Sequence, residues 1–183
     1  MFDKFPKRWW GHSNTNEGHT LFVNLCKRVA IPDAYRNNTS LYLEYKIKDG
    51  ETAMDIAEKL YGNANLWWVI LLTNQIMDIT TQWPVMSYDY QLMIERQHGF
   101  DELLHIHQYE DSLGNINDPA AIRFAENLDA DYTVEEVAVL YGLKPITLED
   151  YLVRKNERLR DVKLIDPDYV NNFVKDLEVL INE

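Results

Sequence analysis

The chain has 183 residues, 46% of them hydrophobic and 26% charged, which is typical of a soluble globular protein with one compact core or two small ones. Its formal net charge of −12 repels phosphate backbones and anionic lipid, so nucleic acid and membranes are disfavoured as partners. Cys26 is the single cysteine, which excludes an internal disulfide, and the first residues lack an apolar signal core, so we expect folding in the cytoplasm.

Residues 1–40 form an aromatic N-terminal arm without a clear helical or strand period. Phe2, Phe5, Trp9 and Trp10 lie there among lysines and an arginine. Aromatic side chains supply many of the hot spots in protein interfaces, so these four are candidate partner-binding residues. An arm of this composition either packs on its own domain or lies across a neighbouring protein, and the sequence leaves both open.

Residues 41–95 show the clearest regular pattern. Apolar and polar residues alternate over 41–48, as in a half-buried strand. Thr52 and the residue three positions later form a capping box at the start of a helix over 52–62, and an asparagine can cap a second helix over 63–74. The segment 90–94 is predicted as a return strand. The expected order is therefore strand, helix, helix, strand.

The sequence pattern of residues 96–183 predicts a mixed, mainly helical region with a terminal strand and helix. Cap residues, turn residues and apolar periodicity set the boundaries of these elements. The predicted elements are a strand over 103–107, a helix beginning at Asp118-Pro119, helices beginning at Thr133 and Thr147, a strand over 162–165 and a last helix from 167. No low-complexity linker separates this region from the preceding one.

Several short motifs between residues 41 and 94 closely resemble a LysM module, a family with a β-α-α-β fold. The matching residues are Tyr45-Lys46-Ile47-Lys48-Asp49-Gly50-Glu51-Thr52, Asp55-Ile56-Ala57, Tyr61-Gly62, Trp67, Ile70, Asn74 and Trp83-Pro84. The resemblance implies a LysM-like module over 41–95, between the arm of 1–40 and a C-terminal region of 96–183. The fold class is then α+β.

A narrower resemblance extends to both ends of the chain. It is carried by the run from Trp67 to Asn74, by Phe2-x-x-Phe5-Pro6 and by the stretch from Asn156 to Val170. Together these motifs resemble the LysM-like baseplate wedge protein 53 family of T-even-like, contractile-tailed bacteriophages. The segment 114–149 matches no family pattern.

The resemblance implies a structural protein of the virion, in the sixfold baseplate at the tail tip, assembled in the host bacterial cytoplasm. Its partners would be other baseplate wedge proteins and adjacent wedges, which it would help to join around the hub. The resemblance implies no catalytic activity, no cofactor and no metal.

LysM modules usually bind N-acetylglucosamine glycans between two loops, which correspond here to 49–52 and 75–82. The second loop contains Ile76, Met77 and Ile79, and such an apolar rim fits a protein interface better than a sugar groove. Glycan binding is therefore disfavoured, and a peptidoglycan-binding LysM protein is the alternative. An enzyme with a glycan-binding module is a third hypothesis, which would require a catalytic carboxylate pair in the second half.

Adjacent tryptophans on a helix point about 100° apart. Trp67 shares a stripe with Ile70 and is predicted in the core, so Trp68 is the candidate partner anchor, although the second half of the chain could cover it equally well. The other candidate partner-binding residues are Trp83, Tyr169 and Phe173.

Two further patterns have weak functional readings. His105 and His107 alternate on a predicted strand, but two histidines with no cysteine nearby indicate solvent-facing residues better than a metal site. Residues 133–152 fit a helix-turn-helix spacing, but the excess of carboxylates is wrong for phosphate contact. The sequence contains none of the common catalytic signatures that we considered.

Overall fold

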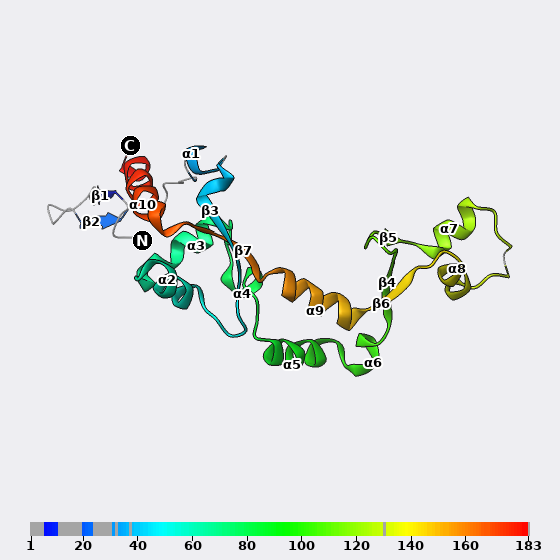
Figure 1. The fold of residues 1–183 in the computed structure, drawn as a ribbon. Coiled ribbons are helices and arrows are strands. Elements are labelled where there is room, and N and C mark those ends of the chain that lie inside the picture. Colours follow the sequence, from blue (N-terminus) through cyan, green and yellow to red (C-terminus); the bar gives the residue numbers. More distant parts are fainter. Residues whose placement is uncertain are drawn as a thin grey trace. The chain divides into compact units, whose positions relative to one another are not determined.

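The computed structural model describes residues 6–10, 20–23, 31, 33–36, 38–129 and 131–182 (Figure 1). The chain divides into two compact units, which we call unit 1 (residues 1–83 and 160–183) and unit 2 (residues 84–159). Unit 2 is thus inserted into the sequence of unit 1. No described helix combines the length and apolar character that a membrane span requires.

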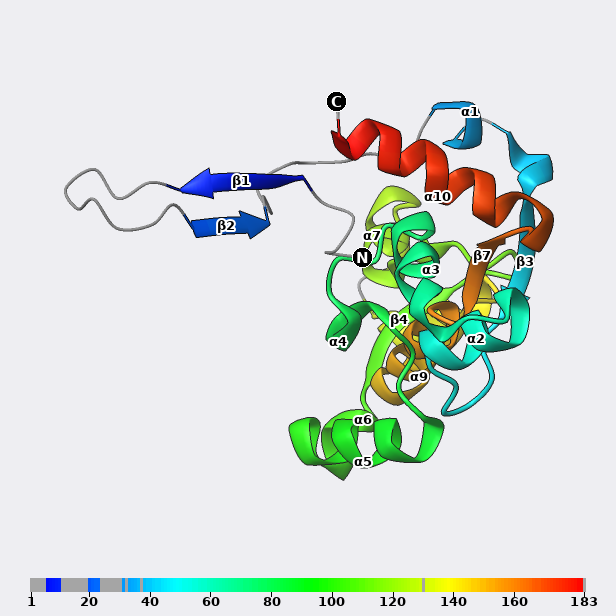
Figure 2. The same ribbon diagram turned by 90° about the vertical axis from the view of Figure 1, so that its left-hand side faces the viewer.

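Unit 1 contains short helices, one long C-terminal helix and two small antiparallel sheets, one of β1 with β2 and one of β3 with β7. Figure 2 shows the β1–β2 pair and the long α10 in a second view. The elements are β1 (Lys7–Trp10), β2 (Thr20–Val23), α1 (Asp33–Arg36), η2 (Thr39–Leu41), β3 (Tyr42–Lys46), α2 (Ala53–Tyr61), η3 (Ala64–Leu66), α3 (Trp67–Thr73), α4 (Ile79–Gln82), β7 (Asp161–Ile165) and α10 (Pro167–Asn182).

The predicted ends of α2 are confirmed. The Thr52 side chain accepts a hydrogen bond from the Asp55 backbone N–H, while the Asp55 carboxylate accepts one from the Thr52 N–H, which completes the capping box. Gly62 follows the helix with φ +66°, a left-handed conformation that glycine adopts without steric cost. The second predicted helix is also present, as η3 and α3, with Asn63 capping its beginning.

The β3–β7 sheet joins the two ends of unit 1. Its strands run antiparallel, with Tyr42 opposite Ile165, Glu44 opposite Lys163 and Lys46 opposite Asp161. Residues 90–94, predicted as the return strand, belong instead to helix α5 (Ser87–His98), so that prediction is wrong. The strand that pairs with β3 comes from near the C-terminus.

Two apolar clusters form the core of unit 1, one on each face of the β3–β7 sheet. The first joins α3 and α10 and contains Tyr35, Trp68, Val69, Ile165, Val170, Phe173, Leu177 and Ile181. The second joins α2, α3 and the sheet and contains Ile47, Ala53, Ile56, Ala57, Ile70, Trp83, Val162 and Leu164. Alternation along each strand supplies residues to both clusters, since successive side chains point to opposite faces.

Unit 2 contains a three-stranded antiparallel sheet in the order β5-β4-β6, together with several helices. Helices α5 and α9 are in contact and run side by side in Figure 1. Its elements are α5, α6 (Phe100–Leu103), β4 (Ile106–Glu110), β5 (Ile116–Asn117), α7 (Pro119–Ala125), α8 (Val134–Leu140), β6 (Lys144–Thr147) and α9 (Leu148–Arg158).

The predicted cap residues of unit 2 are confirmed. Asp118, Thr133 and Thr147 each accept a backbone hydrogen bond at the start of α7, α8 and α9. The strand expected at 103–107 lies a few residues later, because 100–103 form the short helix α6 and β4 begins at Ile106. The observed class is mixed α+β, mostly helical with small antiparallel sheets, as expected at that level.

The two ends of unit 2 are joined by one side chain. The Asn156 amide accepts a hydrogen bond from the Val85 N–H and donates one to the Val85 C=O, both at 2.9 Å. Asn156 is 4% exposed, so water cannot readily replace these bonds. The same motif occurs in unit 1, where Asn74 bonds both backbone groups of Lys163 at 2.8 Å.

Candidate functional site

The loop between α3 and α4 holds its backbone with its own side chains. Gln75 adopts φ +55°, and the Gln82 Oε1 accepts hydrogen bonds from the N–H groups of Met77 (2.7 Å) and Asp78 (2.9 Å). Asp78 then caps α4 by accepting from the Thr80 N–H. Hydrogen bonds from Thr80 and Thr81 lower the pKa of Asp78. The loop therefore has a defined shape without needing a partner.

The end of this loop and the first residue of α4 present two apolar side chains to solvent. Met77 is 92% exposed and Ile79 is 47% exposed, whereas Ile76 is half-buried against the second core cluster. We call Met77 and Ile79 the apolar rim. A nearly bare methionine on a braced loop is suited to burial in a partner, since methionine adapts to irregular surfaces.

Next to the apolar rim lies a groove of about 820 Å³, which we call the open groove. It extends over the face of the β3–β7 sheet that carries Tyr42, Glu44 and Lys163. Its lining consists of Ile31, Arg36, Thr39, Tyr42, Glu44, Leu72, Thr73, Gln75, Met77 and Lys163. Aliphatic, aromatic and charged side chains are mixed in it, as in protein interfaces.

Two details define the chemistry of the open groove. The Tyr42 hydroxyl donates to the Tyr35 carbonyl at 3.0 Å, and burial raises the pKa of Tyr42. The Thr73 Oγ1 atom is buried and has no hydrogen-bond partner in the described part of the chain.

A second hollow of about 400 Å³ continues along the same sheet face and shares Glu44 and Lys163 with the first. Across the two strands Glu44 lies opposite Lys163, and Lys46 lies opposite Asp161. At this end of the face, each acidic side chain therefore lies opposite a basic one on the neighbouring strand. Such cross-strand pairs are mildly stabilising and leave both signs available to a partner.

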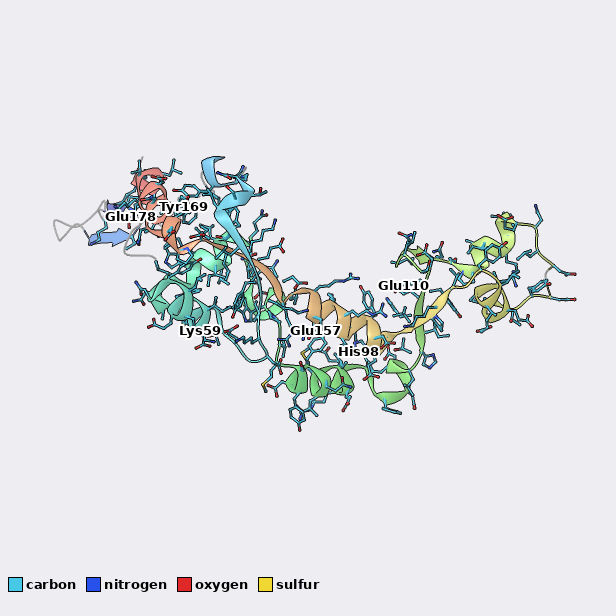
Figure 3. The ribbon with its side chains drawn as sticks, viewed as in Figure 1. Lys59, His98, Glu110, Glu157, Tyr169 and Glu178 are labelled. Carbon is cyan, nitrogen blue, oxygen red and sulfur yellow. The ribbon has the colours of Figure 1, made fainter. Side chains whose placement is uncertain are left out.

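The turn between β3 and α2 is closed around Glu51, which is 7% exposed. Its carboxylate accepts hydrogen bonds from the Tyr45 hydroxyl (2.8 Å), the Lys48 N–H (3.1 Å) and Lys59, a residue of α2 labelled in Figure 3. Burial acts to raise the pKa of Glu51, but these hydrogen bonds outweigh it and lower the pKa.

Trp83 packs against the same turn, and its Nε1–H donates to the Glu51 carbonyl at 3.1 Å. Arg160 adds a second connection, because its Nη2 bonds the Asp49 carboxylate at 2.6 Å. The turn is thus held by the two residues of unit 1 that flank the insertion in the sequence.

Three candidate partner-binding residues are buried in the structure, and partner binding by them stays a prediction. Trp68 is 7% exposed and Phe173 is fully buried, because both pack where α3 meets α10. Trp67, predicted in the core, is half-buried at the edge of both clusters. Trp83 is 9% exposed, since its indole fills the space beside the Glu51 turn.

The remaining candidates divide between exposed and undescribed side chains. Met77 and Ile79 are exposed, and so is Tyr169 on α10 (44%, Figure 3). Phe2 and Phe5 lie outside the described residues. The backbones of Trp9 and Trp10 belong to β1, but their side chains lie outside the description. Partner binding by all of these stays a prediction.

Sequence reasoning missed most of the open groove. Alternation over 41–48 indicates that Tyr42, Glu44 and Lys46 share a face, but no local signal shows that Lys163 lies beside them.

His107 packs its ring on Tyr151, with centroids 4.3 Å apart. Among the described residues, no three His, Cys, Asp or Glu side chains converge as a metal site would require.

Comparison with known proteins gives two findings. The family model described as "Base plate wedge protein 53" matches residues 21–180. The chain is also similar to the "Baseplate wedge protein gp53" of Enterobacteria phage T4, with 27% identity over 143 residues, covering 73% of this chain and 70% of that protein.

Proposed function

Because the chain belongs to the base plate wedge protein 53 family, we propose that it binds neighbouring baseplate subunits through the open groove and the apolar rim. The chain is a non-enzymatic structural protein of the phage tail baseplate and hence a component of the virion. Binding at these surfaces would help wedges join around the hub.

The observation that carries the proposal is the exposure of Met77 on a braced loop beside the open groove. Full burial of a methionine side chain contributes about 1.5–3 kcal/mol. Because the Gln82 side chain already fixes the loop, little ordering entropy opposes that gain.

The proposal also includes a LysM-like module within unit 1. We assign its β-α-α-β order to β3, α2, α3 and β7, with unit 2 inserted before the last strand. This assignment keeps the predicted first strand and both helices but replaces the predicted boundary at residue 95. The antiparallel β3–β7 pairing and the capped α2 support it.

The alternative, a peptidoglycan-binding protein, would use the surface between the loops 49–52 and 75–82. Trp83 packs against the first of these loops and donates to the Glu51 carbonyl. The open groove lies mainly over β3, β7 and the end of α3, and it shares Gln75 and Met77 with the second loop. Because most of the groove lining lies outside both loops, we favour a protein partner in the open groove over a sugar between the loops.

The test measures how tightly the purified chain binds to baseplate wedges that lack it. These wedges are assembled in infected cells in which the chain is not made. The double variant Met77→Glu with Ile79→Glu should bind them at least tenfold more weakly, because burying a charge opposes docking. Met54→Glu is the matched control, since Met54 is an exposed methionine on α2 outside the groove lining.

Four results would decide against the proposal. Unchanged binding of the double variant would exclude the apolar rim, and equal loss in the control would indicate a general charge effect. Loss confined to the variant Trp9→Ala with Trp10→Ala would place binding on the arm. Tight binding of chitin oligomers by the wild-type chain would favour the glycan alternative.

A further inference from the structure

The two backbone edges of β3 differ. The Ile47 N–H donates to the Arg160 carbonyl and the Asp166 N–H donates to the Leu41 carbonyl, both at 2.9 Å. In an antiparallel pair, every second residue directs both backbone groups to the partner strand. Residues 41, 43, 45 and 47 therefore face β7, and residues 42, 44 and 46 direct their backbone groups outward.

The outer edge of β7 is already satisfied by side chains of unit 1. Asn74 donates to the Lys163 carbonyl and accepts from its N–H, both at 2.8 Å. The Tyr61 hydroxyl donates to the Ile165 carbonyl at 3.0 Å. A further strand could not pair along β7 without displacing these side chains.

Within the described residues, the outer edge of β3 has no such cover. The Tyr42 N–H donates to the Thr39 carbonyl. The Tyr42 carbonyl and both backbone groups of Glu44 and Lys46 have no protein partner in the part of the chain that the structure describes. These five consecutive backbone N–H and C=O groups point outward beside the open groove. Such a row is a template on which another strand can pair.

On this basis we propose that an extended segment of a neighbouring baseplate subunit pairs with the outer edge of β3 as a third strand. This inference rests on the proposed function and specifies how the partner binds. The added strand would place every second side chain over the sheet face that carries Tyr42, Glu44 and Lys46, which we call the open face. Its backbone would satisfy the outward groups of residues 42–46.

Charge complementarity specifies the side chains of that segment. Those on the open face lie opposite Tyr42, Glu44 and Lys46, so an apolar, a basic and an acidic residue would each meet a favourable neighbour. The apolar residue would also lie near the end of the sheet that borders the open groove. The partner is therefore a strand with alternating acidic, basic and apolar residues on one face.

A second copy of this chain is the weaker candidate for the same edge. Two chains of net charge −12 repel each other. Pairing of two five-residue strands also buries much less than the roughly 1,200 Å² of a stable interface. A partner segment that continues into the open groove gains the additional apolar area.

The first test is Lys46→Pro, because proline removes the outward N–H and leaves the inward bonds of Tyr45 and Ile47 in place. Proline is tolerated at the free side of an edge strand. Lys46→Gln is the matched control, since it removes the charge but keeps the N–H. We expect Lys46→Pro to weaken binding to wedges that lack this chain at least tenfold, and Lys46→Gln to change it less than threefold.

Amide hydrogen exchange of the wild-type chain tests the same pairing even if the proline variant does not fold. The Glu44 and Lys46 amides should exchange fast in the free chain and become at least tenfold more protected on the wedge. The Tyr45 amide, which faces β7, should be protected in both states. Unchanged exchange at residues 44 and 46 on the wedge would overturn the proposal.

The outcomes separate the edge pairing from the proposed function. If Met77→Glu with Ile79→Glu abolishes binding while Lys46→Pro binds normally, the interface stands and the edge pairing is wrong. If the edge amides become protected at high concentration of the chain alone, with a dimer in sedimentation, the occupant is a second copy and the assignment to a neighbouring subunit fails.

Discussion

Asn156 in unit 2 and Asn74 in unit 1 each bond both backbone groups of a distant residue. We therefore predict that each unit can be destabilised separately. Asn156→Ala removes two hydrogen bonds to Val85 from a residue that is 4% exposed. Each bond contributes about 1 kcal/mol net, and a half-buried backbone group left without a partner costs about 1 kcal/mol more. We therefore expect unit 2 to lose about 2–4 kcal/mol.

Asn74→Ala is the matching change in unit 1. Its bonds to Lys163 are solvent-exposed, so water replaces part of what is lost and the expected cost is about 1–2 kcal/mol. It also removes the Asn74 side chain that covers the outward backbone groups of Lys163. The two variants thus remove the same type of hydrogen-bonded contact, at a buried site in unit 2 and at a solvent-exposed site in unit 1.

Urea unfolding followed by two probes distinguishes the units. All five tryptophans, at positions 9, 10, 67, 68 and 83, belong to unit 1, so their fluorescence reports on that unit. Far-UV circular dichroism reports on both. Asn156→Ala should lower the midpoint of a dichroism transition and leave the fluorescence midpoint in place, whereas Asn74→Ala should shift the fluorescence.

The reasoning would be refuted if Asn156→Ala unfolded within about 0.5 kcal/mol of the wild type, the range of ordinary surface changes. It would also fail if Asn156→Ala shifted only the fluorescence. Equal shifts of both probes in both variants would show that the units unfold together, and the separate destabilisation would then be wrong.

Two further predictions concern unit 1. The folded pKa of Glu51 lies below its ordinary value of 4.5, so its contribution is complete above about pH 5 and is lost as pH falls through the folded pKa. Thermal melts of Glu51→Gln should therefore fall less steeply with acid than those of the wild type, and parallel curves would contradict this. Replacing residues 84–159 with a Gly/Ser linker of about four residues should leave unit 1 folded, because Trp83 and Arg160 both bond the 49–51 turn. Loss of the cooperative fluorescence transition would show that unit 1 needs the insertion.

Local signals in the sequence were sufficient to place most helix ends. Thr52, Thr133 and Thr147 each begin a helix because a side-chain oxygen satisfies a free N–H, which depends only on nearby residues. Family membership, and with it the structural role in the baseplate, was also within reach of the motifs.

Long-range pairing was not predictable from such signals. The run from Tyr90 to Ile94 fits either a strand or a helix, since Tyr90 and Ile94 are also one helical turn apart, and the resemblance favoured a strand. The orientation of Trp68 depended on α10, which covers it from the far end of the sequence. The open groove was missed for the same reason, because Lys163 reaches it only through β7.

The insertion also affects the order in which the chain is made. Asp49 and Arg160, which form an ion pair in unit 1, are 111 positions apart. At about 5–20 residues per second, a ribosome takes roughly 5 to 20 seconds between them. During that time β3 has not yet met its partner strand β7, while all of residues 84–159 emerge. Unit 2 can therefore be complete before unit 1 closes, and a newly made chain would be most prone to misassembly in that interval.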